Sequence, residues 1–130
     1  QSLMQSGDIE TNPGPVAEHG ELCIMHVNAR SLRNKLDLFE AESHQFDIIT
    51  ISETWLSPSD TNNSLLLKNF HPPVRLDRPN DPHGGVAIFV KDYLYCKPRP
   101  DLVTDDLETV WIETKIDQEN LLIWILLSPP

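Results

Sequence analysis

A strand–helix–strand pattern near the start of the chain most constrains its fold. Residues 22–27 form a short apolar run that suits a buried strand, and residues 47–52 form a second run rich in β-branched side chains. The intervening residues 32–45 carry apolar side chains at helical spacing, at Leu32, Leu36 and Phe39. Strands joined in this way form a βαβ unit with parallel strands and a right-handed crossover. The pattern therefore predicts an α/β fold.

The rest of the chain predicts more strands with short connections. Runs over 86–90, 109–116 and 121–127 each have the length and composition of a strand. Polar loops that contain proline separate the earlier runs, as at 57–63. Short connections of this kind favour an antiparallel, hairpin-rich extension of the first unit.

Composition bounds the class of protein. The 130 residues suffice for one domain, and a formal net charge of −10 argues against non-specific electrostatic binding of DNA. That charge does not exclude an enzyme that reaches phosphates through a metal ion. Two cysteines, Cys23 and Cys96, are too few for a disulfide framework and favour an intracellular setting, cytoplasmic or nuclear. No run approaches the roughly 18 apolar residues that cross a bilayer, so no membrane association is expected.

Three short motifs follow the predicted strands, where α/β folds place their chemistry. They are Asn28-Ala29-Arg30-Ser31-Leu32, Ser52-Glu53-Thr54-Trp55-Leu56, and Arg78 followed by Gly84-Gly85-Val86-Ala87. Their order and spacing resemble the endonuclease/exonuclease/phosphatase superfamily, which shares its fold with DNase I and the apurinic endonucleases. The likeness is nearest to the endonuclease domain of non-long-terminal-repeat retrotransposons. It implies a DNase I-like αββα sandwich, of which residues 21–130 would form about the first half.

The resemblance also implies roles for individual residues. Glu53 matches the carboxylate that holds a divalent metal, usually Mg²⁺, and one or two carboxylates are sufficient for such a site. Asn28 matches the asparagine that orients the metal site and the scissile phosphate. Arg78 is a weaker candidate for contact with DNA phosphate. Trp55 and the Gly84-Gly85 turn are expected to serve as framework around Glu53.

Each candidate also has a structural interpretation. Glu53 taken singly is an ordinary loop carboxylate, and a lone loop arginine such as Arg78 is usually just solvated. Asn28 or Ser31 is a fair N-cap for the predicted helix. The five histidines show no metal-ligand spacing, and His83 suits a turn.

Later motifs of the family are expected beyond residue 130. These are an Asp-x-Asn motif that supplies the base and a Ser-Asp-His motif near the end of the domain. The end of the chain, Leu127-Ser128-Pro129-Pro130, keeps only the prolines of a preceding turn motif. Hydrolysis needs a positioned base as well as a metal, so residues 21–130 are expected to be inactive alone. A half-sandwich is also expected to expose an apolar sheet face and unpaired strand edges.

Residues 1–20 are polar, rich in turn formers and expected to be a disordered leader. Within it, residues 8–15 fit the pattern D-x-E-x-N-P-G-P, through Asp8, Glu10, Asn12, Pro13, Gly14 and Pro15. This pattern resembles the 2A-type ribosome-skipping peptides, in which the bond between glycine and the last proline is never made. Proline is a secondary amine with a locked φ, which makes Pro15 a poor nucleophile for that bond. The alternative is an ordinary surface turn.

Two functions therefore compete. The first is the N-terminal part of a metal-dependent endonuclease that nicks target DNA, with the reverse transcriptase region of the same polyprotein as its partner. The second is a skipping element that acts in cis on the ribosome, with a decayed, non-enzymatic remnant as its cargo.

Overall fold

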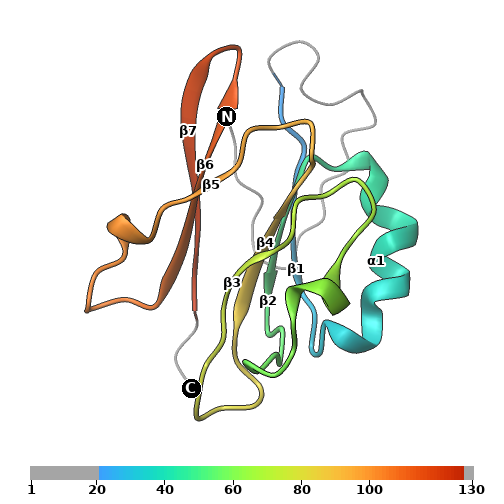
Figure 1. Cartoon of the computed structure of the whole chain (residues 1–130), viewed down its shortest axis with the longest axis vertical. Helices are drawn as coiled ribbons and strands as arrows, with labels where there is room; N and C mark the ends of the chain where they lie inside the picture. The colour runs from blue at the N-terminus through green and yellow to red at the C-terminus, as the bar shows by residue number, and fades with distance from the viewer. Residues whose placement is uncertain (1–20, 128–130) are drawn as a thin grey trace.

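The two predicted strands pair in parallel in the computed structural model, which describes residues 21–127 (Figure 1). Strand β1 (Ile24–Asn28) lies beside β2 (Ile48–Ser52), with Ile24 opposite Ile48 and Asn28 opposite Ser52. The βαβ prediction is confirmed in its order and in its parallel pairing. Strand β2 is a nearly continuous apolar run because it is buried on both faces of the sheet.

The helix between them is shorter than the sequence predicts. Helix α1 (Leu36–Glu42) is flanked by the 3₁₀ turns η1 (Arg33–Lys35) and η2 (Ser43–Gln45). The prediction that Ser31 or Asn28 caps the helix is wrong, because α1 starts after Lys35 and has no side-chain cap. The chain has turned through left-handed conformations at Arg30 and Ser31 before the first helical turn begins. The predicted apolar face is nevertheless present, since Leu32 and Phe39 are buried.

Two further strands complete the first sheet, in the order β1-β2-β4-β3. Strand β4 (Val86–Val90) runs antiparallel to β2 and is buried along its whole length. Strand β3 (Val74–Leu76) pairs with the outer edge of β4. Its three residues are too few to show a periodic pattern, and the sequence did not predict it.

A second sheet has the order β5-β6-β7. The long hairpin of β6 (Thr109–Ile116) and β7 (Glu119–Leu126) was predicted and is confirmed as antiparallel. Strand β5 (Lys97–Pro98) was not predicted, because two exposed residues carry no hydrophobic signal. Short 3₁₀ turns η3 (Asn62–Leu65) and η4 (Pro100–Leu102) lie in the connections.

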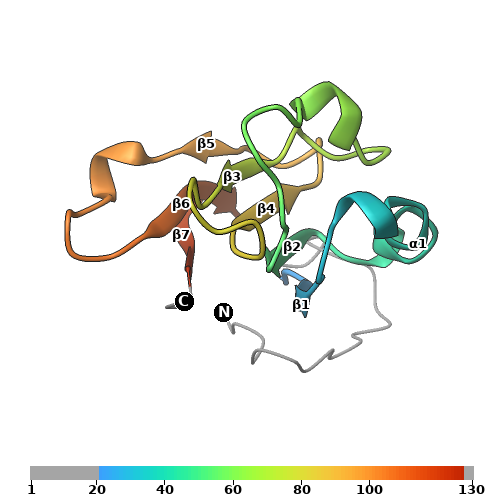
Figure 2. The same cartoon turned by 90° about the horizontal axis from the view of Figure 1, so that it is seen from below.

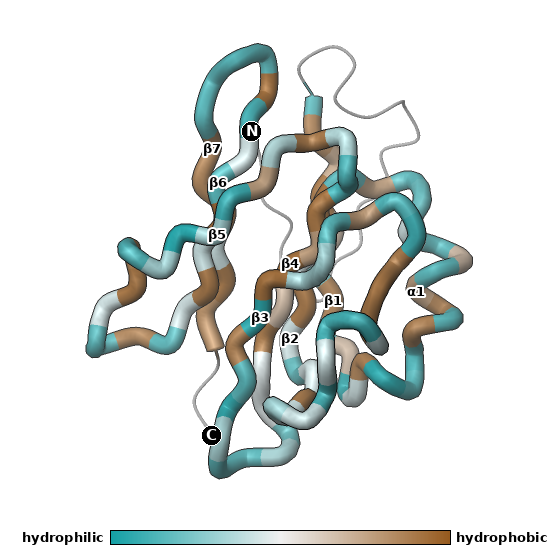
Figure 3. Tube along the Cα trace, viewed as in Figure 1, coloured by the Kyte–Doolittle hydropathy of each residue, from teal (hydrophilic) through white to brown (hydrophobic). Residues whose placement is uncertain are grey.

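The elements form layers, with the four-stranded sheet between α1 on one side and the three-stranded sheet on the other (Figures 1 and 2). One apolar core joins the first sheet to α1 and to the segment around Leu65 and Phe70. A second core lies between the two sheets, around Ile88, Ile112 and Ile123. Figure 3 shows the central strands as mainly hydrophobic and the long loops as mainly hydrophilic. The predicted mixed α/β class is confirmed.

Within residues 21–127, no helix is both long enough and apolar enough to cross a bilayer.

Candidate active site

The parallel pairing of β1 and β2 brings the two strongest candidate residues together. Asn28 ends β1, and Glu53 directly follows β2, so both lie at the same edge of the sheet. The Asn28 carboxamide donates a hydrogen bond from Nδ2 to Glu53 Oε2, over 2.6 Å. Asn28 is exposed and Glu53 half-buried, so a ligand from solvent can reach both.

Backbone strain is concentrated beside this pair. Glu53 and Trp55 have φ values of 54° and 57°, and Arg30 and Ser31 have φ values of 47° and 85°. Left-handed conformations are costly for residues with a side chain, and they persist only where neighbouring contacts hold them. A concentration of such residues in two adjacent segments is typical of functional sites.

Backbone hydrogen bonds hold the Glu53 segment from both sides. On one side, the amides of Ser31 and Leu32 donate to the carbonyls of Glu53 and Thr54, over 3.1 and 3.0 Å. On the other side, the Thr54 amide donates to the Gly85 carbonyl over 3.2 Å, and the Trp55 amide donates to the Gly84 carbonyl over 2.9 Å. The turn that carries Glu53 is therefore clamped between the β1 end and the β4 start.

Gly85 makes the second of these contacts possible. Its φ is +100°, and a Cβ added there would lie 2.4 Å from Thr54 Oγ1. Thr54 is fully buried, so its side chain has no room to move away. The framework role predicted for the glycine pair is a close backbone approach of this kind, at a position where only glycine fits.

A cavity of about 690 Å³ opens beside the Glu53 turn. Among the side chains that line it are Arg33, Asn34, Trp55, Arg78 and His83. The Trp55 ring meets the His83 ring edge to face, with centroids 4.6 Å apart. Trp55 Nε1 is buried and has no hydrogen-bond partner among the described residues. His83 thus packs as a wall of this cavity.

Arg78 lines the same cavity but is held by acidic neighbours. Its guanidinium is 3.0 Å from Asp81 and 3.8 Å from Glu108, and its side chain is only 11% exposed. Asp81 also accepts a hydrogen bond from the His83 amide, and these contacts hold the pKa of Asp81 below its usual value. Contact between Arg78 and DNA remains a prediction, one that would require these pairs to rearrange.

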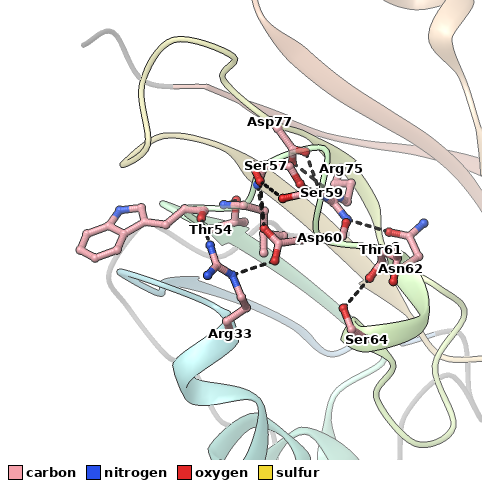
Figure 4. A network of polar contacts seen from close by, with 12 residues as sticks. Arg33, Thr54, Ser57, Ser59, Asp60, Thr61, Asn62, Ser64, Arg75 and Asp77 are labelled. Carbon is pink, nitrogen blue, oxygen red and sulfur yellow. Dashed lines mark hydrogen bonds and ion pairs between the residues drawn. The ribbon is translucent and has the colours of Figure 1, made fainter.

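A polar network behind the site fixes the loop after Trp55 (Figure 4). Arg75 on β3 binds Asp77 through Nε and Nη2, over 3.1 and 2.7 Å. The same guanidinium donates to the carbonyls of Ser57 and Asp60, over 2.9 and 2.6 Å. Because five fixed donors of one arginine serve several acceptors, the loop is tied to β3 without secondary structure of its own. The sequence carried no signal for this network, since Arg75 is 15 and 18 residues away from Asp60 and Ser57.

The donor set at the strand ends fits one side of a Mg²⁺ site. Mg²⁺ prefers oxygen ligands and binds through one or two carboxylates together with waters and substrate phosphates. Glu53 supplies a carboxylate, and Asn28 supplies a carboxamide oxygen, since its nitrogen faces Glu53. Residues 21–127 contain no cluster of three or more His, Cys, Asp or Glu side chains that could hold a metal by themselves. These residues could therefore hold Mg²⁺ only with oxygen atoms from elsewhere.

The comparison with protein families agrees with this geometry. A model of the endonuclease/exonuclease/phosphatase family matches residues 21–129. The chain therefore belongs to this family. Its members are hydrolases of the nuclease or phosphatase type, and they generally depend on a divalent metal ion. None of the curated proteins matches the chain.

The structure does not describe all of the predicted site residues. Residues 8–15, which carry the skipping motif, lie outside the described residues. The sequence also did not single out roles for Arg33 and Lys35. Both follow the Asn28–Leu32 motif, and each contacts backbone carbonyls beside the site, which no side-chain pattern reveals.

Proposed function

We propose that this chain is the N-terminal part of a Mg²⁺-dependent DNA endonuclease. The observation that carries the proposal is the contact between Asn28 and Glu53 at the carboxyl ends of two parallel strands. A carboxylate and a carboxamide in that position suit a metal-assisted attack on a phosphodiester.

The two side chains divide the work. Glu53 provides the carboxylate for the metal, and its hydrogen bond with Asn28 fixes one carboxylate oxygen, which leaves the other free to bind. Outer contacts of this kind orient metal ligands in proteins generally. When bound, Mg²⁺ would polarise the phosphodiester and stabilise the charge that develops on its oxygens. The glycine pair that precedes β4 and the hydrogen bonds around Thr54 keep the carboxylate in place.

The biological role follows from the motif resemblance. We propose that the parent protein nicks a DNA target site for retrotransposition and that the reverse transcriptase region of the same polyprotein uses the freed 3′ end. Residues 8–15 would then separate this product from an upstream protein on the ribosome, with Pro15 as its first residue.

Two measurements test the proposal. Titration of the 130-residue chain with Mn²⁺, followed by paramagnetic broadening in NMR spectra, is expected to affect resonances around Asn28 and Glu53 first. Glu53→Gln is expected to remove that effect, because it replaces the only carboxylate of the pair. Equal broadening in the wild type and the Gln variant would contradict the proposed metal role.

Nicking of supercoiled plasmid by the same chain in Mg²⁺ is expected to be absent. The reason is that Asn28 and Glu53 provide no base to activate water. Nicking that Glu53→Gln abolishes would show instead that these residues suffice for catalysis.

The alternative function is a skipping element with a non-enzymatic remnant as cargo, and the motif at residues 8–15 favours it. A dual-reporter translation assay tests it independently of the nuclease. Two separate products are expected from the wild-type motif and one fused product from Pro15→Ala. A single fused product from both would rule out skipping.

A further inference from the structure

We propose that Arg33 and Lys35 are positioning residues for the Asn28–Glu53 pair. The two cations lie on the single turn η1 and hold the two strained site segments through their backbone carbonyls. The proposal rests on the proposed function, because it assigns these residues to the geometry of the metal site.

Lys35 holds the segment that follows Asn28. Its Nζ donates to the carbonyls of Ala29 and Arg30, the second over 3.1 Å. These carbonyls lie where the chain enters the left-handed conformations of Arg30 and Ser31. An ammonium group has three donors and suits converging carbonyl oxygens. Lys35 is half-buried, so this charge is partly shielded from water and its bonds are correspondingly stronger.

Arg33 holds the segment that follows Glu53. Its Nη2 donates to the carbonyl of Trp55 over 2.9 Å, and Trp55 is itself left-handed. Its Nε is 2.9 Å from Asp60 Oδ1 (Figure 4). Asp60 is fixed in turn, because its other carboxylate oxygen accepts a hydrogen bond from the Ser57 amide over 2.9 Å.

Because Arg33 and Lys35 both lie on η1, this one turn holds both segments of the site. Residues two apart on one 3₁₀ turn point in different directions, and here each reaches a different segment of the site. The same two segments are joined by the bonds from Ser31 and Leu32 to Glu53 and Thr54. Loss of either cation would let one segment relax from its left-handed conformation and draw the Asn28 carboxamide away from Glu53.

A purely structural role would have different consequences. If the cations only stabilised the fold, their removal would lower the free energy of unfolding but leave the Asn28–Glu53 contact intact in the folded molecules. The Asn28 side-chain amide reports on that contact directly, because its hydrogen bond to a carboxylate shifts its ¹H and ¹⁵N resonances.

The experiment compares Lys35→Met and Arg33→Met with the wild-type chain. Lys68→Met is the matched control, since Lys68 is an exposed lysine remote from η1 in sequence. Each protein is examined for the Asn28 side-chain amide resonances, for its affinity for Mn²⁺ and for its Tm. We expect both η1 variants to lose the shifted Asn28 resonances and to bind Mn²⁺ about tenfold more weakly, as outer-shell substitutions do. Lys68→Met should match the wild type in all three.

The outcomes separate this inference from the proposed function. Mn²⁺ binding that Glu53→Gln leaves unchanged would defeat the proposed function, while the Asn28 resonances would still report on η1. Wild-type resonances in both η1 variants would overturn the positioning role, whatever their Tm. If Lys35→Met does not fold, Arg33→Met decides, because its side chain is 53% exposed and its loss leaves no buried gap.

Discussion

Gly85 lets the Glu53 turn and the start of β4 meet at backbone contact. A side chain at this position would have to adopt a φ of +100° and would overlap the buried Thr54 hydroxyl. Gly84 is less restricted, because its φ is not left-handed and an added Cβ there would come no closer than 3.0 Å, to the Arg78 side chain.

Gly85→Ala is therefore expected to destabilise the fold by about 2–3 kcal/mol, which combines left-handed strain with overpacking. Gly84→Ala serves as the matched control and should cost less, because the closest approach there is 3.0 Å instead of 2.4 Å and no left-handed φ is required. Urea denaturation measures the free energy of unfolding of both variants. An equal loss of unfolding free energy in the two variants would show that the contact with Thr54 is not the reason that glycine is needed at position 85.

Asp47 is a fully buried carboxyl at the start of β2. It accepts hydrogen bonds from the Cys23 amide over 3.0 Å and from the Tyr93 hydroxyl. Burial raises the pKa of Asp47, while the Tyr93 bond lowers it by favouring the ionised form. Because burial dominates, Asp47 contributes stability that is present at low pH and is lost as the pH rises through its pKa.

Tyr93→Phe is expected to destabilise the protein by about 1 kcal/mol at pH values above the pKa of Asp47, where the carboxyl group is ionised and the lost bond is charge-assisted. Since the Tyr93 bond favours the ionised carboxylate, the loss should shrink as the pH falls through the pKa of Asp47. Urea denaturation at several pH values measures this. Tyr95→Phe, a neighbouring exposed tyrosine, is the control and should show no such pH dependence. A Tyr93→Phe loss that is independent of pH would argue against the Asp47 contact.

At the scale of elements, the β6–β7 hairpin depends on an unfavourable turn. Ile116 pairs with Glu119, so Asp117 and Gln118 form a two-residue connection. Both have positive φ, 50° and 67°, as a type I′ turn requires. Asp117 suits the first position of such a turn, but Gln118 stands at the second position, where glycine is preferred.

Gln118→Gly is expected to stabilise the protein by about 1 kcal/mol, because it removes left-handed strain at a solvent-exposed position. Gln118→Ala keeps a Cβ and should be close to neutral. Thermal and urea denaturation measure both variants. A loss of stability in the glycine variant would mean that the turn is not strained in solution.

At the scale of the whole molecule, an exposed apolar face is found on the second sheet and not on the first. Both faces of the four-stranded sheet are covered, one by α1 and its neighbours and the other by the second sheet. A row of exposed apolar side chains lies on the outer face of the second sheet, where Leu122, Trp124 and Leu126 are 42–43% exposed. Among the described strands, β7 pairs only with β6, so its other edge is open.

Self-association of the 130-residue chain is therefore expected to rise with concentration. Leu122→Lys should reduce it, since it places a charge on the open strand opposite Glu113. Leu38→Lys is the control, because Leu38 is 54% exposed on α1, away from that face. Sedimentation velocity measures the self-association of the wild type and of the two variants. A wild-type chain that stays monodisperse and melts cooperatively would count against an exposed interaction face.

Long or strongly patterned elements could be predicted from the sequence. Strands β1, β2, β4, β6 and β7 each carry an apolar run, because each buries side chains in one of the two cores. Strands β3 and β5 could not be predicted, since two or three residues at a sheet edge are specified by backbone pairing with a neighbour. The same holds for the start of the helix, where Lys35 precedes α1 and its side chain turns to the site carbonyls.

The candidate site, too, could be predicted only in part from the sequence. The sequence by itself determined the βαβ order and the residues Asn28 and Glu53, because hydrophobic period and short motifs are local properties of the chain. Only the tertiary structure decided that these residues touch and that the Gly85 backbone meets Thr54. It also decided that Arg33 and Lys35 bind the carbonyls beside the site. Several of those contacts join residues that are distant in sequence, such as Thr54 and Gly85, and most use backbone atoms that every residue shares, so no pattern of side chains encodes them.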